Sequence, residues 1–218
     1  MGLVRFDAID GSSVDREQLA RDGVISSDLD YPDGTLGCAL SHIALWRFAV
    51  ESQTPVTIAE DDAVFNRDFE YHATKLQTES SSWDFISWGA SLKCYQWLNV
   101  LPAGTGARLQ FFPGNILEGL KEFQNSTFKP TLLPASFLLG LQCYSVSPTA
   151  ALRLLEVCLP LRQQIIDFTG FGLRLSNTGI DVPINAVLHR MQTYTCLPPL
   201  VLSDERLDSD RITADRPS

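Results

Sequence analysis

The segment TIAEDDAVF, residues 57–65, places three carboxylates directly after a short apolar run: Glu60, Asp61 and Asp62. Hard divalent cations such as magnesium and manganese take oxygen ligands, typically one or two carboxylates plus the phosphates of a substrate. Strand alternation would send Glu60 and Asp62 to one side and Asp61 to the other, so two carboxylates could converge on one cation. A solvated turn or the N-cap of a following helix explains the same cluster equally well, because acidic side chains favour both positions.

The elements around this cluster predict an α/β fold with a mostly parallel sheet. Residues 56–59 and 83–88 have the composition of buried strands, and residues 68–78 can form a helix between them. A strand, a helix and a strand at this spacing favour a parallel pair with helices on both faces of the sheet. In such sheets ligands lie beyond the carboxyl ends of the strands, and Glu60, Asp61 and Asp62 fall at that edge.

Further elements follow from periodicity and capping signals. We expect strands at residues 4–9, 137–146 and 193–196, and helices at residues 14–21 and 36–51. Ser147 followed by Pro148 predicts the start of another helix, and Asp181 is placed to cap the segment DVPINAVLHRM.

The chain reads as one domain spanning residues 1–218, without repeats or linkers. Residues 91–136 contain many prolines and glycines but also many aromatic side chains, so we expect an irregular, partly ordered binding segment there. Residues 203–218 form a polar tail.

Composition excludes several kinds of partner. The 218 residues include 17 basic and 26 acidic side chains, a formal charge of -9, and no basic run, so we expect no nucleic-acid partner. No apolar run approaches the roughly 20 residues that cross a bilayer, and the N-terminus lacks a signal-peptide core, so we expect no transmembrane segment and a cytoplasmic location. The five cysteines share no C-x-x-C spacing, which suggests small buried thiols rather than disulfides or a zinc site.

Several motifs together resemble glycosyltransferase family 25, which contains lipooligosaccharide galactosyltransferases and their collagen-modifying relatives. The motifs are FDAIDG, LGCALSHIALW, TIAEDDAVF, WDFISWGAS, YSVSPTAALRLL, GIDVPINAVL and YTCLPPLV with the trailing SDRI, in this order from Phe6 to Ile212. The resemblance implies a GT-A type fold with a single Rossmann-like sheet. It also implies a UDP-sugar donor, UDP-galactose or UDP-glucose, and a divalent metal, commonly manganese with magnesium as the alternative.

The resemblance also assigns roles to individual residues. Asp62 corresponds to the family's metal ligand, and Glu60 would assist at the ion or at the donor ribose. Asp61 would contact the donor or orient the motif. Asp181 would be the general base of an inverting hexosyl transfer, deprotonating the hydroxyl of a glycan or lipid-linked acceptor; a helix N-cap is an equally weighted alternative for this residue.

Three further residues have donor-side roles by the same comparison. Ser41 and His42 lie in the GCALSH motif, where we expect donor-pocket positions, although a histidine on an apolar helix is often a core residue. Asp10 could reach the donor or simply form a turn before Gly11.

Family members normally carry one more strand before the position of Phe6, so we expect the first strand to be missing here. The edge left open could pair with a second chain and give a homo-oligomer. A catalytically inactive binding or assembly module is therefore the main alternative to an active transferase in cell-surface glycan biosynthesis. A glycoside hydrolase acting through two carboxylates is a third possibility.

Overall fold

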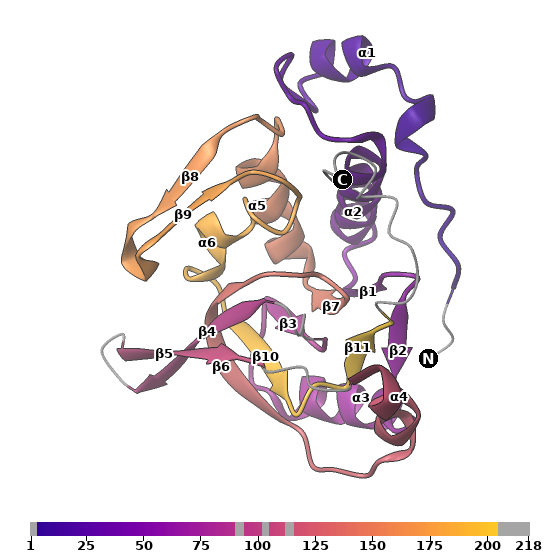
Figure 1. The fold of residues 1–218 in the computed structure, drawn as a ribbon, viewed down its shortest axis with the longest axis vertical. Coiled ribbons are helices and arrows are strands. Elements are labelled where there is room, and N and C mark those ends of the chain that lie inside the picture. The colour runs from indigo at the N-terminus through magenta and orange to yellow at the C-terminus, as the bar shows by residue number, and fades with distance from the viewer. Residues whose placement is uncertain (1–3, 90–93, 102–104, 112–115, 205–218) are drawn as a thin grey trace, which may run out of the picture.

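The computed structural model describes residues 4–89, 94–101, 105–111 and 116–204 (Figure 1). Its helices are α1 Arg16–Arg21, α2 Asp33–Ser52, α3 Phe69–Glu79, α4 Ile116–Asn125, α5 Pro148–Cys158 and α6 Asn185–Leu188, with 3-10 turns at Gly11–Ser13 and Thr169–Phe171. Its strands are β1 Val56–Ala59, β2 Ala63–Phe65, β3 Phe85–Ser87, β4 Tyr95–Leu101, β5 Thr105–Gln110, β6 Thr131–Leu138, β7 Cys143–Val146, β8 Ile165–Phe168, β9 Leu173–Ser176, β10 Thr193–Leu197 and β11 Val201–Ser203.

The main sheet has seven strands in the order β1-β7-β3-β10-β6-β4-β5. Only β3 and β10 form a parallel pair; the other neighbours in this sheet are antiparallel. The α/β class is confirmed, but the prediction of a mostly parallel sheet is wrong. β1, α3 and β3 do follow in this order, with the short strand β2 between β1 and α3. β1 and β3 point the same way, but β7 lies between them in the sheet. A local strand-helix-strand pattern does not reveal which distant strand will be inserted.

Helices cover both faces of this sheet, as predicted (Figure 1). Phe85 of β3 and Tyr144 of β7 face a large apolar cluster with α2, α5 and α6. The next residue of β3, Ile86, and the preceding residue of β7, Cys143, face a second cluster that includes Ala73 of α3. Alternation along the strands therefore divides the core into two layers, as expected for strands buried on both sides.

Several predicted elements are confirmed close to their predicted bounds. Residues 56–59 form β1, residues 36–51 lie inside α2, and residues 68–78 nearly coincide with α3. Ser147 caps α5 by accepting a hydrogen bond from the Ala150 backbone N–H at 3.1 Å, with Pro148 in the first turn. The helix expected at residues 14–21 begins at Arg16, after the N-cap Asp15. None of the helices in the described ranges combines the length and the apolarity required to cross a bilayer.

Two predicted strands are wrong. Residues 4–9 form no strand, and they pair with no strand in the described ranges; Val4 is 90% exposed. Residues 137–146 contain two strands, because β6 ends at Leu138 and β7 begins only at Cys143. A connection with Gly140 at a φ of 83° separates them, a backbone conformation that glycine adopts readily.

The prediction of an irregular segment at residues 91–136 is also wrong for its described residues. They contain β4, β5, α4 and the first part of β6, whereas residues 91–93, 102–104 and 112–115 lie outside the description. Pro134 disguised the β6 strand, since proline is rare inside sheets. The pairing of β4 with β6 shifts register between Trp97 and Leu98, next to Ala135, so Pro134 lies beside a bulge.

Candidate functional site

The carboxylate motif begins where β1 ends. The Glu60 backbone N–H donates to Gln142 O at 2.9 Å, and its carbonyl accepts from Ala63 N–H at 3.2 Å. Residues 60–63 therefore form a turn between β1 and β2, and the strand alternation expected to run through Asp62 stops at this turn. The solvated-turn interpretation describes Asp61, which is exposed, whereas only 18% of the Glu60 side chain is exposed.

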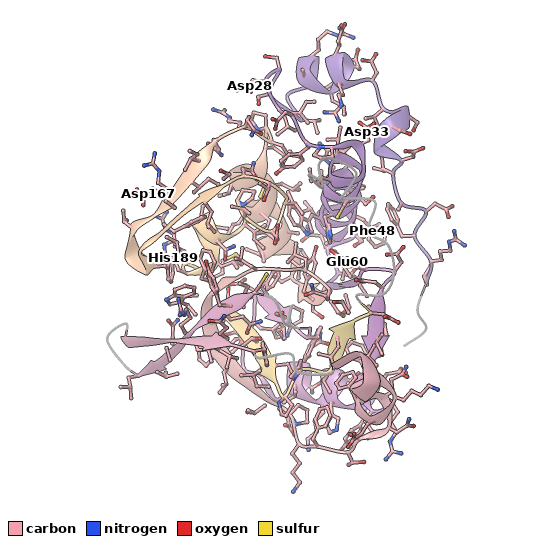
Figure 2. All side chains as sticks on the ribbon, in the orientation of Figure 1. Asp28, Asp33, Phe48, Glu60, Asp167 and His189 are labelled. Atoms are coloured by element: carbon pink, nitrogen blue, oxygen red, sulfur yellow. The ribbon has the colours of Figure 1, made fainter. Side chains whose placement is uncertain are left out.

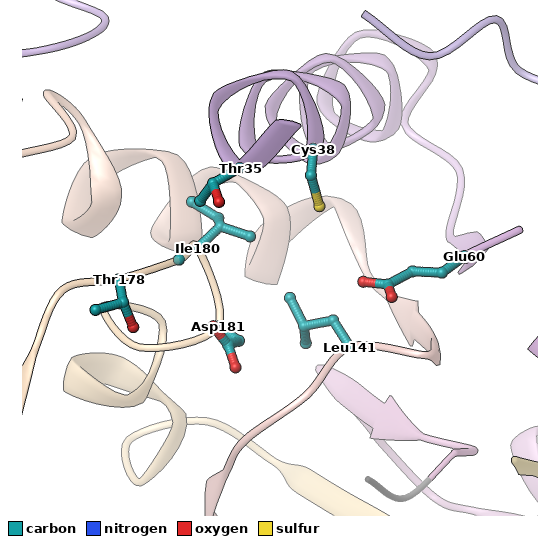
Figure 3. Close-up of a pocket in the computed structure, with 8 residues that line it drawn as sticks. Thr35, Cys38, Glu60, Leu141, Thr178, Ile180 and Asp181 are labelled. Atoms are coloured by element: carbon teal, nitrogen blue, oxygen red, sulfur yellow. The ribbon is translucent and has the colours of Figure 1, made fainter. Parts of the chain in front are cut away.

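Glu60 lines a cavity of about 210 Å³ that is built from segments far apart in the sequence (Figure 3). The start of α2 contributes Thr35 and Cys38, and the β6–β7 connection contributes Leu141. The remaining lining residues, Thr178, Gly179, Ile180 and Asp181, come from the loop after β9. The cavity thus brings together two of the predicted site residues, Glu60 and Asp181. Because β1, β3 and β10 point the same way, Glu60 lies at the edge where the carboxyl ends of these three strands meet.

Asp181 is held by the backbone of the β6–β7 connection and does not cap a helix. Its Oδ2 accepts a hydrogen bond from Gly140 N–H at 3.0 Å. The following helix, α6, starts at Asn185, and its N-cap position is occupied by Ile184. The helix-cap alternative for Asp181 is therefore wrong, and its carboxylate is positioned beside the cavity by a contact that joins two loops.

Asn185 is a positioning residue that sequence reasoning missed. Its Oδ1 accepts from Leu138 N–H at 2.7 Å, and its Nδ2 donates to Leu138 O at 2.8 Å and to Asp181 O at 2.7 Å. A fully buried amide that bonds both to the end of β6 and to the Asp181 backbone fixes that loop against the sheet. The only sequence signal was its place within the segment DVPINAVL.

His42 is 4% exposed and lies between Glu60 and a buried hydroxyl. Its Nε2 is 3.7 Å from Glu60 Oε1, and its Nδ1 forms a 2.8 Å hydrogen bond with the Tyr144 hydroxyl. Trp46 Nε1–H donates to the same hydroxyl at 2.8 Å. Burial by itself lowers the pKa of His42, but interactions with Cys38 and Glu60 outweigh burial and raise it to about 9. His42 is thus tied to Glu60, although it does not line the cavity itself.

Cys38 completes a cluster of three side chains with metal-binding chemistry. Donor atoms of Cys38, His42 and Glu60 all lie within 4.8 Å of one another. The cysteine pattern predicts a small buried thiol at this position, whereas Cys38 is only partly buried. The available signal was its spacing of four residues from His42, which puts both side chains on one face of α2.

Ser41 and Asp10 make structural contacts away from the cavity lining. Ser41 Oγ donates to Gly37 O at 2.8 Å and accepts from Ile9 N–H at 2.9 Å, which attaches the N-terminal segment to α2. Asp10 accepts from the hydroxyl and the backbone N–H of Ser12, and these hydrogen bonds lower its pKa. Asp10 therefore starts the turn at Gly11–Ser13, as its alternative interpretation proposed.

Asp62 lies partly buried in the turn after Glu60, and its carbonyl accepts from Asp204 N–H at 2.9 Å. This bond continues the pairing of β2 with β11. Asp61 and Asp62 are not among the residues that line the cavity. Of the predicted pair Glu60 and Asp62, Glu60 lines the cavity and Asp62 does not.

Comparison with known proteins assigns the sequence to a family. No curated protein matches the chain. The family model described as "Glycosyltransferase family 25 (LPS biosynthesis protein)" matches residues 2–169, which include Glu60 and the whole of α2 and α5. Asp181 and β10 lie beyond the matched residues. The match covers most of the chain, and the protein therefore belongs to glycosyltransferase family 25.

Proposed function

We propose that the protein is a metal-dependent, inverting hexosyltransferase that moves galactose from UDP-galactose to a glycan or lipid-linked acceptor. Family membership implies glycosyl transfer in lipopolysaccharide biosynthesis. The observation that carries the finer proposal is that Glu60 and Asp181 line one cavity although they are distant in the sequence. We assign the fold to the GT-A type because β1, β3 and β10 share a direction and Glu60 follows β1 at their common edge.

The cavity is sized for part of the donor. Its volume of about 210 Å³ is below the roughly 300–1,000 Å³ typical of pockets that enclose a whole small-molecule ligand. We therefore assign the cavity to the transferred sugar ring and the reacting acceptor hydroxyl. The nucleotide would extend beyond it, towards the turn that carries Asp61 and Asp62.

Asp181 is the proposed general base. In the transfer, the acceptor oxygen forms a bond to the anomeric carbon while the bond from that carbon to the diphosphate breaks, and UDP leaves. The acceptor proton passes to the Asp181 carboxylate. Gly140 N–H fixes Oδ2 of this carboxylate, and Asn185 fixes its backbone, so the base is held in one position as the acceptor arrives.

The carboxylates of Glu60 and Asp62 fit a hard divalent cation by their chemistry, because both offer oxygen donors only and both belong to the turn between β1 and β2. Manganese, or magnesium, bound there would offset the charge of the diphosphate leaving group. The side chain of Glu60 points into the cavity (Figure 3), so it would hold the ion at the sugar end of the donor. Asp62 would bind it from the turn.

The proposal is tested by UDP release from UDP-galactose in the presence of manganese and an acceptor. Asp181→Asn should lower kcat about 10²–10⁴-fold, the usual contribution of a general base, with little change in the KM for the donor. Asparagine can still accept from Gly140 N–H, so the fold should persist. Asp167→Asn is the matched control, because this exposed carboxylate lies on the β8–β9 hairpin, away from Glu60 (Figure 2).

Asp62→Ala separates the metal role from the base role. It should raise the manganese concentration needed for half-maximal activity, whereas Asp181→Asn should not. If calorimetry detected no binding of UDP-galactose to the unmodified protein with manganese present, the transferase proposal would be overturned in favour of a binding or assembly module.

A further inference from the structure

The cluster of Cys38, His42 and Glu60 contains three different donor atoms: a thiol sulfur, an imidazole nitrogen and a carboxylate oxygen. Cys38 and His42 lie one turn apart on the long helix α2, which holds these two donors more firmly than a loop would. Glu60 is the first residue of the turn after β1, and its backbone N–H donates to Gln142 O at 2.9 Å. No part of the proposed sugar transfer uses the thiol.

The spacing of the donors suits a shared tetrahedral cation. Zinc bonds of about 2.1 Å to nitrogen or oxygen and about 2.3 Å to sulfur place neighbouring ligands of a tetrahedral site roughly 3.4–3.6 Å apart. His42 Nε2 and Glu60 Oε1 are 3.7 Å apart, which is too long for a direct hydrogen bond and close to that ligand separation. All three donors lie within 4.8 Å of one another, so small side-chain movements would bring them onto one ion.

The surroundings of His42 are those of a metal-binding imidazole. Its second ring nitrogen, Nδ1, is engaged at 2.8 Å by the hydroxyl of Tyr144, which is itself fixed by Trp46. Metal-bound histidines commonly use the second nitrogen in this way, which sets the tautomer and the ring orientation.

One side of the cluster opens to the cavity. Cys38 and Glu60 line the cavity, whereas His42 is buried behind them. A cation held by the three protein donors would therefore face the cavity with its remaining coordination position. Three protein ligands and one open position is the arrangement of zinc sites that exchange their fourth ligand.

We propose that Cys38, His42 and Glu60 form a site for a borderline divalent cation of the zinc type, open to the sugar cavity. A thiolate and an imidazole select zinc over magnesium and manganese, which prefer oxygen donors. This cation is therefore distinct from the one that Glu60 and Asp62 would hold for the diphosphate. Glu60 belongs to both sets.

The shared ligand has a regulatory consequence, which rests on the proposed function. Zinc at this site would bind Glu60, which could then no longer hold the manganese or magnesium ion proposed for the diphosphate. Zinc would also project into the cavity assigned to the sugar. Zinc should accordingly inhibit transfer, and excess manganese should not restore it fully, because Cys38 and His42 add affinity that manganese lacks.

The site is tested with Co²⁺ as a spectroscopic probe on the full chain after removal of bound metals, without nucleotide sugar. A thiolate-to-cobalt charge-transfer band in the near ultraviolet should appear at one equivalent of Co²⁺, and Zn²⁺ should abolish it by displacement. Cys38→Ser should remove the band, and His42→Gln should weaken binding more than the roughly 10–100-fold lost with an outer-shell partner. Cys94→Ser is the matched control, because Cys94 is likewise a partly exposed cysteine outside any disulfide but lies outside the cluster.

Absence of the band, its persistence in Cys38→Ser, or its loss in Cys94→Ser would each overturn the proposal. Thermal unfolding of each variant without metal should show the same cooperative transition as the unmodified protein, and added zinc should raise Tm only when Cys38 is present. Because no nucleotide sugar is added, the results with cobalt and zinc are independent of sugar transfer. A protein that binds cobalt through Cys38 but releases no UDP would overturn the proposed function alone.

Discussion

At the scale of single residues, Tyr144 joins the buried polar groups of α2 to the sheet. Its hydroxyl is bonded to both His42 and Trp46, and its ring stacks on Phe85 at a centroid distance of 4.9 Å. All these side chains are almost completely buried. The orientation of His42 towards Glu60 therefore depends on one hydroxyl that belongs to a different element.

We predict that Tyr144→Phe lowers the free energy of unfolding by about 1–3 kcal/mol, because the buried Trp46 N–H and a His42 ring nitrogen lose their partner. Urea denaturation would measure the change. Tyr194→Phe is the control: its hydroxyl makes only an exposed contact with Gln192 at 3.3 Å, so its loss should cost less than about 0.5 kcal/mol. Equal stability of the two variants would show that the Tyr144 hydroxyl holds nothing in place.

At the scale of elements, the N-terminal segment packs on α2 through glycine. A Cβ added to Gly37 would lie 2.3 Å from Ile9 O and 2.8 Å from Gly11 N. Ser41, one turn later on α2, accepts the hydrogen bond from Ile9 N–H. The motif LGCALSH thus encodes a face of α2 on which another backbone lies, as well as the two donors Cys38 and His42.

We predict that Gly37→Ala destabilises the fold by about 1–3 kcal/mol, the usual cost of overpacking, despite the better helix propensity of alanine. Hydrogen exchange should show the loss of protection at the Ile9 amide first. Gly119→Ala in α4 is the matched control, because nothing lies within 4 Å of its added Cβ. It should be neutral or stabilising by up to about 1 kcal/mol, and a similar loss in both variants would contradict the packing explanation.

At the scale of the whole molecule, the last part of the chain completes both the sheet and the cavity. β10 lies between β3 and β6 in the middle of the sheet, and Asp181 lies beside the cavity. Both come after residue 169, where the match to the family model ends. The matched region therefore lacks a central strand and the proposed base.

We predict that a fragment of residues 1–169 does not fold cooperatively. Without β10, the facing edges of β3 and β6 lose their partners and the apolar residues around Ile86 lose part of their cover. Near-ultraviolet circular dichroism during heating should show no sharp transition, whereas residues 1–218 purified in the same way should show one. A cooperative transition in the fragment would mean that the sheet closes without its central strand.

Much of the local structure could be predicted from the sequence. Ser147 and Pro148 mark the start of α5, the apolar run before Glu60 marks β1, and helical spacing marks α2, because caps and periodicity depend on neighbouring residues. The same logic failed at residues 4–9, where an apolar pattern finds no partner strand in the described chain. It also failed at Pro134, which lies inside β6 beside a bulge.

The sequence by itself determined the family, the carboxylates after β1 and most helix boundaries. Only the tertiary structure decided that β7 separates β1 from β3. It also decided that the Asp181 carboxylate accepts a hydrogen bond from Gly140 N–H instead of capping a helix, and that Cys38 and His42 lie close to Glu60. Strand order and side-chain convergence depend on how distant segments pack, and no local pattern encodes that packing. The residue types therefore indicated the chemistry of the cavity, but the sequence did not show which residues line it.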